Sequence, residues 1–260
     1  MRVCLTAYKL LAYYLLLIFF ACGGLLLSLF CLLLSWLPDT PRVERFFQQL
    51  IHRHFSLWLW WLRQTRLVSF TYEGFERLPR GRGLVLVANH PGLMDITYLL
   101  ARLPEAVCIF KPGIRRNPVL GAAARSAGYL ANDGGIDLLR AASAKVAAGH
   151  TLVIFPEGTR TRGGLLNPLK PGFALIAQRA RTPIQTVRIA CDSNLPIKNR
   201  AWGKLPRLPA HVTLTLGKCF PPPETHRVPA TVTEVETWFR RALTDHSPPS
   251  AAAVPPEAPS

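Results

Sequence analysis

The hydrophobic pattern divides the chain into an apolar N-terminal part and a longer part in which short apolar runs alternate with amphipathic ones. Residues 10–37 form a 28-residue run without a charged side chain. A helix of that length would measure about 42 Å, against roughly 30 Å for the hydrocarbon core of a membrane. The run therefore predicts a strongly tilted transmembrane helix, or a re-entrant hairpin that bends near Gly23-Gly24.

A cleaved signal peptide is the alternative for this run, but the run is too long and has no convincing small-residue cleavage site. Basic side chains flank it on both sides, which favours the hairpin because both flanks then stay in the cytoplasm. We expect residues 1–37 to anchor the chain in the inner (cytoplasmic) cell membrane. The rest of the chain would then face the cytoplasm.

Residues 38–67 place many aromatic side chains among basic ones in a segment that is compatible with a helix. This composition is typical of a helix in the lipid headgroup region. The alternative is a core helix of the following domain. The residues concerned are Arg42, Arg45, Arg53, Arg63 and Arg66, with Phe46, Phe47, Phe55, Trp58, Trp60 and Trp61.

Strand-like and helix-like segments alternate over residues 68–246, which predicts a single α/β domain with a mostly parallel sheet flanked by helices. Asn117-Pro118 is a suitable N-cap and first-turn pair. The Pro/Ala/Ser-rich tail at 247–260 is predicted to be disordered. Strands are expected at 83–88, 106–110, 151–155, 184–189 and 212–216, and helices at 92–103, 118–127, 136–148, 172–181 and 231–243.

The net charge of +16 would by itself suggest a nucleic-acid partner. The apolar run indicates instead that the positive charge binds anionic lipid and an anionic substrate, so no nucleic-acid partner is expected. The six cysteines show neither a Cys-x-x-Cys pair nor regular spacing, which indicates reduced packing residues rather than a metal site.

His90 and Asp95 follow a predicted strand, where open α/β sheets place ligands. With His90 in the loop and Asp95 in the first helical turn, the carboxylate can fold back onto the imidazole. Asp95 would then hold the proton of one ring nitrogen, and the other nitrogen could accept the proton of a hydroxyl group. The alternative is a loop histidine next to a first-turn acid that offsets the helix dipole.

A second turn, Phe155–Arg160 (Phe-Pro-Glu-Gly-Thr-Arg), follows another predicted strand of the same sheet. Arg160 offers a planar charged fork that suits phosphate, and Gly158 permits close backbone approach. Glu157 would bond a substrate hydroxyl or orient Arg160, or else tie down the turn. Thr159 completes the candidate substrate-binding set.

These two blocks, in this order, resemble the motifs of the glycerolipid acyltransferase family, best known for the 1-acylglycerol-3-phosphate acyltransferases. The resemblance covers about residues 70–220 and includes Gly164-Leu165 and Lys170-Pro171-Gly172. It implies His-Asp general-base catalysis by His90 and Asp95. No cofactor or metal is implied, since acyl-CoA or acyl carrier protein would be a co-substrate.

Other basic residues are possible anion contacts. Lys111, Arg115 and Arg116 follow a predicted strand end, where they could meet the phosphates of coenzyme A or the acidic surface of acyl carrier protein. Lys170 and Arg162 are possible secondary anion contacts. Solvated surface charge is the alternative for all five.

One stretch departs from the family pattern. Many members have Gly-x-(Ile/Val)-Phe-(Ile/Val)-Asp-Arg, with the arginine implicated in binding the phosphate of the acceptor. Here the stretch is 128–134, and Gly134 stands in place of the arginine. The later Pro-rich block is also altered, at 182–187. A neutral residue cannot replace a charge-assisted phosphate contact.

We therefore expect a membrane-bound O-acyltransferase that moves a fatty acyl group from a thioester to a hydroxyl of a lysophospholipid. The alternative acceptor is an amino-acid lipid, a glycolipid or a polyene ester. A hydrolase is disfavoured because the sequence has no Gly-x-Ser-x-Gly elbow. The alternative to an enzyme is a non-catalytic basic protein that binds a membrane or nucleic acid. Acyl chain length, donor carrier and oligomeric state are open.

Overall fold

The structure is a computed structural model that describes residues 2–34, 36–38, 40–79, 81–161, 165–193, 195 and 206–245, the side chains of Arg2 and Val3 excepted. Arg162, Gly164 and the tail at 247–260, for which the sequence makes predictions, lie outside these residues.

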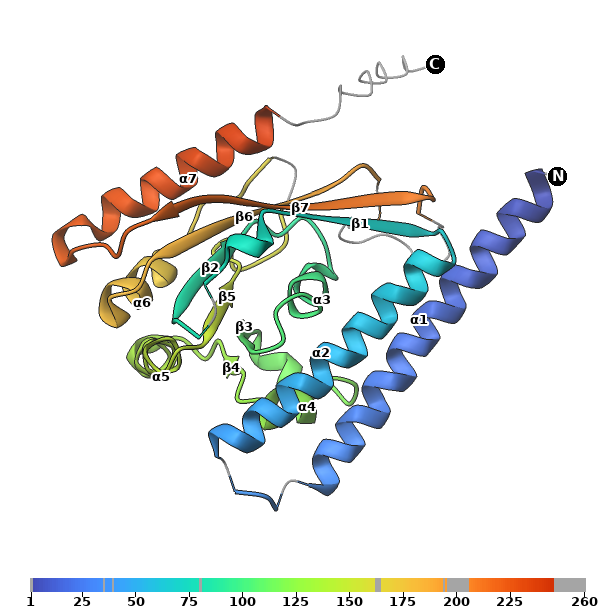
Figure 1. The fold of residues 1–260 in the computed structure, drawn as a ribbon, viewed down its shortest axis with the longest axis horizontal. Helices are drawn as coiled ribbons and strands as arrows, with labels where there is room; N and C mark the ends of the chain where they lie inside the picture. The colour runs from blue at the N-terminus through green and yellow to red at the C-terminus, as the bar shows by residue number, and fades with distance from the viewer. Residues whose placement is uncertain are drawn as a thin grey trace, which may run out of the picture.

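A seven-stranded sheet forms the centre of the domain, in the order β1-β7-β6-β2-β5-β3-β4 (Figure 1). Every neighbouring pair is parallel except β6 and β7, so the predicted mostly parallel α/β fold is confirmed. The strands are β1 (Val68–Glu73), β2 (Leu84–Ala88), β3 (Ala106–Phe110), β4 (Leu130–Ala131), β5 (Thr151–Ile154), β6 (Ile184–Cys191) and β7 (Ala210–Phe220).

Helices cover both faces of this sheet, as Figure 1 shows. Strand β2 is buried on both sides: Val85 and Val87 point into the core under α5, α6 and α7, whereas Leu86 and Ala88 point into the core under α2 and α3. This explains the continuous apolar run of β2. The helices of the domain are α3 (Asp95–Leu100), α4 (Gly121–Ser126), α5 (Gly135–Ala147), α6 (Gly172–Ala180) and α7 (Val228–Thr244).

The N-terminal apolar run is one continuous helix, α1 (Arg2–Leu33), and part of it, Cys4–Leu33, is long and apolar enough to cross a membrane. The expected bend at Gly23-Gly24 is therefore wrong; the chain turns only after the helix ends. These glycines serve close packing instead. A Cβ atom at Gly23 would lie 2.5 Å from Cε1 of His54, and one at Gly24 would lie 2.5 Å from Cγ1 of Val119.

Helix α2 (Pro41–Gln64) runs back along α1 (Figure 1). The Thr40 hydroxyl caps it by accepting the N–H of Val43 at 3.3 Å. Its inner face belongs to the domain core, as the core-helix alternative predicts, and its outer face keeps exposed aromatics. Buried are Phe47, Gln48, Ile51, Phe55, Trp58, Leu59 and Leu62, and exposed are Phe46, Leu57, Trp60 and Trp61.

Two polar ties fix α2 to the domain. The buried Gln48 side-chain amide donates to the carbonyl of Ala127 at 2.9 Å. Glu44 forms an ion pair with Lys145 of α5. Gly128, which has φ +67, lies next to this pair, because a Cβ atom there would lie 2.5 Å from Glu44 Oε1.

Several element boundaries differ from those expected. The helix predicted at 118–127 begins only at Gly121, because Asn117 Oδ1 accepts the N–H groups of Val119 (2.8 Å) and Leu120 (3.1 Å) and so holds a separate turn. The helix predicted at 92–103 is shorter, spanning Asp95–Leu100. Strands β1 and β4 were not predicted.

Candidate active site

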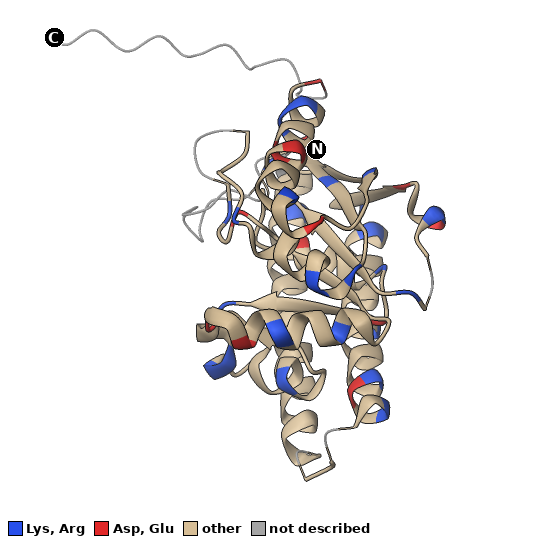
Figure 2. Ribbon diagram, turned by 90° about the vertical axis from the view of Figure 1, so that its left-hand side faces the viewer, with Lys and Arg blue, Asp and Glu red and all other residues tan. Residues whose placement is uncertain are grey.

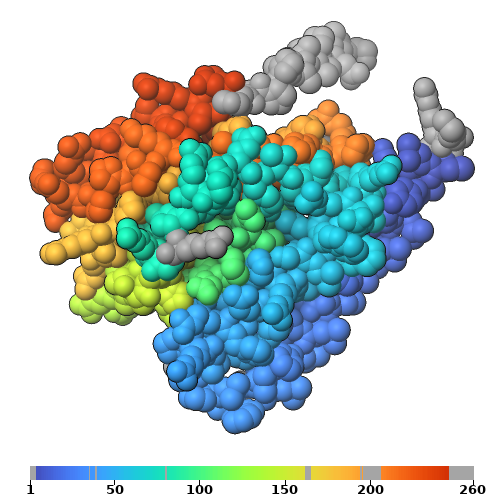
Figure 3. Space-filling view, viewed as in Figure 1, coloured from blue at the N-terminus to red at the C-terminus, as the bar shows by residue number. Residues whose placement is uncertain are grey.

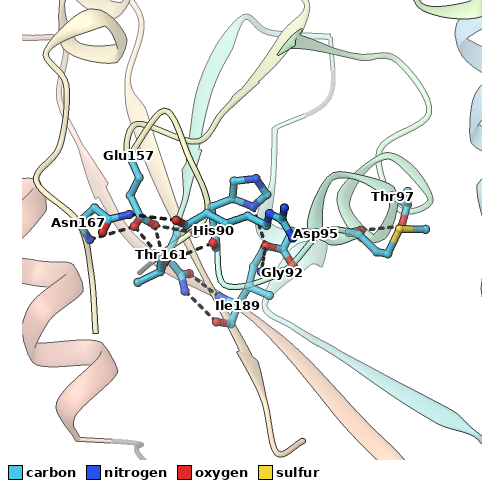
Figure 4. Close-up of polar contacts among 11 residues, drawn as sticks. His90, Gly92, Asp95, Thr97, Glu157, Thr161, Asn167 and Ile189 are labelled. Atoms are coloured by element: carbon cyan, nitrogen blue, oxygen red, sulfur yellow. Dashed lines mark hydrogen bonds and ion pairs between the residues drawn. The ribbon is translucent and has the colours of Figure 1, made fainter. Parts of the chain in front are cut away.

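Two neighbouring strands bring the sequence motifs together. His90 follows β2 and Phe155 directly follows β5, and the two strands pair in parallel with Val87 opposite Ile154. The carboxyl ends of both strands therefore reach the same edge of the sheet (Figure 4). Beside them, the buried Asn89 side chain accepts the N–H of Ile189 at 2.7 Å and donates to its carbonyl at 2.9 Å, which ties the loop to β6.

His90 and Asp95 form the predicted pair: His90 Nδ1 lies 2.8 Å from Asp95 Oδ2. Asp95 is the first residue of α3 and is only 1% exposed. Its Oδ2 also accepts the N–H of Gly92 at 2.7 Å. An ionised carboxylate accepts hydrogen bonds only, so Nδ1 carries the proton and Nε2 is left as the acceptor. The imidazole lines the cavity described below.

Glu157 is buried and bonded to the protein through both oxygens. Oε1 accepts the backbone N–H of His90 at 2.8 Å, and Oε2 accepts the N–H of Asn167 and the hydroxyl of Thr161, both at 2.9 Å (Figure 4). These three donors leave at most one of the four acceptor sites of the carboxylate, so a bond from Glu157 to a substrate hydroxyl stays a prediction. The alternative, that it ties down the turn, describes it correctly.

Two further contacts join the motifs. The N–H of Thr161 donates to the carbonyl of His90 at 2.9 Å. The ring of Phe155 stacks on the imidazole of His90, with centroids 4.3 Å apart and planes inclined by 22°. The sequence analysis missed the roles of Phe155, Thr161 and Asn167. The first belongs to the quoted motif, but nothing in the sequence showed that its ring faces the histidine.

A cavity of about 480 Å³ begins at His90 and extends to the N-terminal helices. Its walls are mostly apolar and come from α1, α2, α3, α4 and the central strands. Representative residues are Leu27, Ile51, Phe55, Leu100, Phe110 and Tyr129. Cys108 also lines it, but burial raises the pKa of this thiol to about 12, so it stays protonated and is a poor nucleophile.

Lys111, Arg160 and Lys170 also line this cavity. Among the residues that the structure describes, none of their charged groups has an ion-pair or hydrogen-bond partner. Lys170 crosses the turn at Gly158, where φ is +66 and a Cβ atom would lie 3.0 Å from Nζ. The site thus combines the imidazole of His90, an apolar cavity and three cations that can bind an anion.

The other candidate residues do not line the cavity. Arg115 is exposed and pairs with Asp133 at 3.3 Å. Arg116 is exposed too, and Thr159 lies in the turn without reaching the cavity wall. Gly134 precedes α5 with φ +78 and ψ −178, a backbone that only glycine adopts readily. No side chain of the family's arginine type fits this backbone without a change in the loop.

The comparisons with known proteins agree with these motifs. A model of the acyltransferase family matches residues 69–190. A 1-acyl-sn-glycerol-3-phosphate acyltransferase from Helicobacter pylori is 38% identical over 108 residues, which cover 39% of this chain and 46% of that protein. A lyso-ornithine lipid O-acyltransferase from Pseudomonas aeruginosa is 32% identical over 136 residues, covering 50% of this chain and 52% of the relative. The chain thus matches about half the length of these curated relatives.

A solved structure has the same fold. The crystal structure of the 1-acyl-sn-glycerophosphate (LPA) acyltransferase PlsC from Thermotoga maritima superposes with a TM-score of 0.62 and covers 94% of this chain and 96% of that one. Because the sequence identity is 23%, this similarity supports a conclusion about the fold alone.

Proposed function

Because this chain belongs to the glycerolipid acyltransferase family, we propose that it transfers a fatty acyl group from a thioester to a hydroxyl of a lysophospholipid. The observation that carries the proposal is the His90–Asp95 pair at 2.8 Å, which opens on an apolar cavity that three cations also line.

In the proposed reaction, Nε2 of His90 takes the proton of the acceptor hydroxyl as its oxygen attacks the thioester carbonyl. Asp95 holds the opposite nitrogen and stabilises the imidazolium that forms. When the tetrahedral intermediate collapses, the C–S bond breaks and the thiolate takes the proton from His90. The acyl group passes directly to the acceptor, consistent with the protonated Cys108 as the cavity's thiol.

The cavity suits a fatty acyl chain. Its volume of about 480 Å³ lies within the common range for ligand pockets, and its wall is apolar over most of its length. We propose that the chain of the donor lies there, with the thioester at His90. The carrier, coenzyme A or acyl carrier protein, would remain outside, where Lys111 and the exposed Arg115 and Arg116 face solvent.

The three cations that line the cavity, Lys111, Arg160 and Lys170, support an acceptor with a phosphate group, as in the substrate named for the Helicobacter relative. A second acceptor class has its own support. Gly134 occupies the place of the family's phosphate-binding arginine, and the Pseudomonas relative is named for a phosphate-free acceptor, a lyso-ornithine lipid. We therefore keep an amino-acid lipid as the second candidate acceptor.

We propose that α1 and α2 attach the protein to the cytoplasmic face of the inner membrane by lying in its surface. Polar ties join α1 to the domain from Tyr8, whose hydroxyl donates to the Thr65 carbonyl (3.1 Å), to Ser28, which donates to the Val119 carbonyl (2.8 Å). These ties span about 30 Å of helix, the full thickness of the hydrocarbon core. A crossing helix would draw the attached domain into the lipid.

The surface supports this orientation. The two N-terminal helices form one continuous side of the molecule in Figure 3. The exposed residues of these helices and of the segment between them include Leu11, Leu26, Trp36, Phe46 and Trp60. Basic residues are spread over the helices and loops, as Figure 2 shows. Those of α2, which are Arg42, Arg45, Arg53 and Arg63, suit a surface of anionic lipid. Tryptophans at the edge of an apolar face are typical of the membrane interface.

The test is an acyl-transfer assay on the full-length protein in mixed micelles. Thiol release from oleoyl-CoA is followed without acceptor, with lysophosphatidic acid, and with a lyso-amino-acid lipid. Acceptor-dependent thiol release with formation of the diacyl product supports the proposal. Thiol release that is equal with and without acceptor would mean a hydrolase, and no release with any acceptor or with acyl carrier protein as donor would overturn it.

A further inference from the structure

The ring of Phe155 covers one face of the imidazole of His90, and no function has yet been assigned to this contact. The centroid distance of 4.3 Å and the 22° inclination describe a stacked pair. Phe155 comes from the turn after β5, whereas His90 comes from the loop after β2. The two motifs therefore meet at the side chain of the base itself as well as through the backbone.

The Asp95 bond alone does not fix the orientation of the base. It holds one atom, Nδ1, and a single hydrogen bond tolerates a range of angles, so the imidazole keeps some rotation about its bond to Cβ, a torsion that is broad for histidine. A flat ring packed against the imidazole restricts that rotation. With Asp95 at one edge and Phe155 at one face, Nε2 is held toward the cavity that His90 lines.

Stacking has a second consequence for the reaction. The imidazole becomes a cation when it takes the hydroxyl proton, and a cation over the face of an aromatic ring within about 6 Å is attracted by the ring's electrons. This attraction is absent while His90 is neutral. It therefore favours the charged state that forms during transfer, which is the condition for raising the rate.

We propose that Phe155 is a positioning residue for His90: it fixes the plane of the imidazole and stabilises the imidazolium by stacking. This inference rests on the proposed role of His90 as the general base. Phe155 also lines the cavity, so a simple contact with the acyl chain is the competing explanation. The two differ in what they change, because loss of a chain contact weakens donor binding and loss of positioning slows the chemical step.

The kinetic test compares Phe155→Leu, which keeps an apolar side chain without a ring, with Phe155→Tyr, which keeps the ring. Phe155→Leu should lower kcat by about tenfold or more, with the donor KM changed less than about twofold. Phe155→Tyr should keep kcat within about threefold of the original. Phe239→Leu is the matched control, because Phe239 of α7 is fully buried in the core and does not line the cavity. Thermal unfolding of each variant identifies loss of folding.

An NMR measurement tests the contact without any turnover. Protons above an aromatic ring are shielded, so the ring C–H signals of His90 should move downfield in Phe155→Leu and stay near their original position in Phe155→Tyr. Loss of the signals in His90→Gln assigns them. If the signals do not move, or if kcat survives in Phe155→Leu, or if the loss appears in KM alone, the proposal is wrong. Failure of the proposed acyl transfer would instead leave the NMR result intact.

Discussion

The carboxylate of Glu157 accepts the backbone N–H of His90 at 2.8 Å, so the acid of one motif holds the histidine of the other. The same carboxylate accepts hydrogen bonds from the hydroxyl of Thr161 and the N–H of Asn167, and Glu157 is only 4% exposed. A buried acid with this many protein donors organises three separate chain segments at one point. The turn that carries Arg160 and the loop that carries His90 are thereby built as one unit.

Replacing Glu157 by alanine should therefore damage catalysis more than acceptor binding. We expect Glu157→Ala to lower kcat by about 10²-fold, since an error of about 1 Å in a reacting group costs that much. Thr161→Val, which removes one donor and keeps the carboxylate, should cost much less. Steady-state kinetics with varied acceptor measures both. A loss confined to the acceptor KM would return Glu157 to the role of a substrate ligand.

His90→Ala should lower kcat by about 10²- to 10⁴-fold, the usual contribution of a positioned acid–base group. Asp95→Asn should also be strongly impaired, because an amide in place of the carboxylate no longer fixes the proton on Nδ1. If the protein is membrane-bound as proposed, both variants should pellet with membranes to the same extent as the original protein. Turnover above about a tenth of the original in His90→Ala is incompatible with its role as base.

Arg160→Lys should not restore a phosphate-dependent activity, because an ammonium group cannot reproduce the two-point contact of a guanidinium. The expected result is a raised KM for lysophosphatidic acid and a smaller change for a phosphate-free hydroxy lipid, at one fixed donor concentration. Arg116→Lys is the control, since Arg116 is exposed and does not line the cavity. Equal effects on both acceptors would place the Arg160 contact on the donor.

Gly134→Arg should fail to raise the use of lysophosphatidic acid, because the backbone at this position, with φ +78, strains any other side chain. We expect a lower melting temperature, corresponding to about 1–3 kcal/mol. Gly113→Ala is the matched control: it also has open space around its Cβ position but has no positive φ. A gain in lysophosphatidic acid turnover without loss of stability would show that the loop adapts.

If α1 lies in the membrane surface, both of its ends should face the same side. In variants with one cysteine, a membrane-impermeant maleimide should label Cys4 and an introduced Pro38→Cys from the same side of sealed vesicles. Cys219, exposed on the domain, reports the side on which the domain lies. Labelling of residues 4 and 38 from opposite sides would establish a transmembrane helix. Alkaline carbonate extraction measures the strength of the attachment separately.

The central part of the fold and of the site could be predicted from the sequence. Buried strands such as β2 and β5 are continuous apolar runs, and each is followed at once by a polar motif, so the meeting of His90 with Arg160 at one sheet edge could be predicted. The His90–Asp95 contact also followed, because five residues separate a loop position from the first turn of a helix.

The remaining features depend on tertiary packing. Gly23-Gly24 suggested a bend, but a helix accepts glycine where a neighbouring chain comes close, and here His54 and Val119 do so. Likewise, the aromatic residues of α2 divide between core and surface according to what faces them. Glu157 had suitable chemistry for a substrate contact, and only the positions of His90 and Asn167 show that it also ties the two motifs together.

The hydrogen bond from Gln48 to Ala127 attaches α2 to the segment that leads into Tyr129, and the Glu44–Lys145 ion pair attaches it to α5. Ile51 and Phe55 of the same helix line the cavity. Helix α2, which would bind the protein to lipid, is thus also part of the wall of the cavity. Exchanging the two N-terminal helices for an unrelated membrane anchor would keep the protein at the bilayer but leave the cavity next to His90 without one of its walls. Attachment and substrate selection in this protein would therefore have to be engineered together.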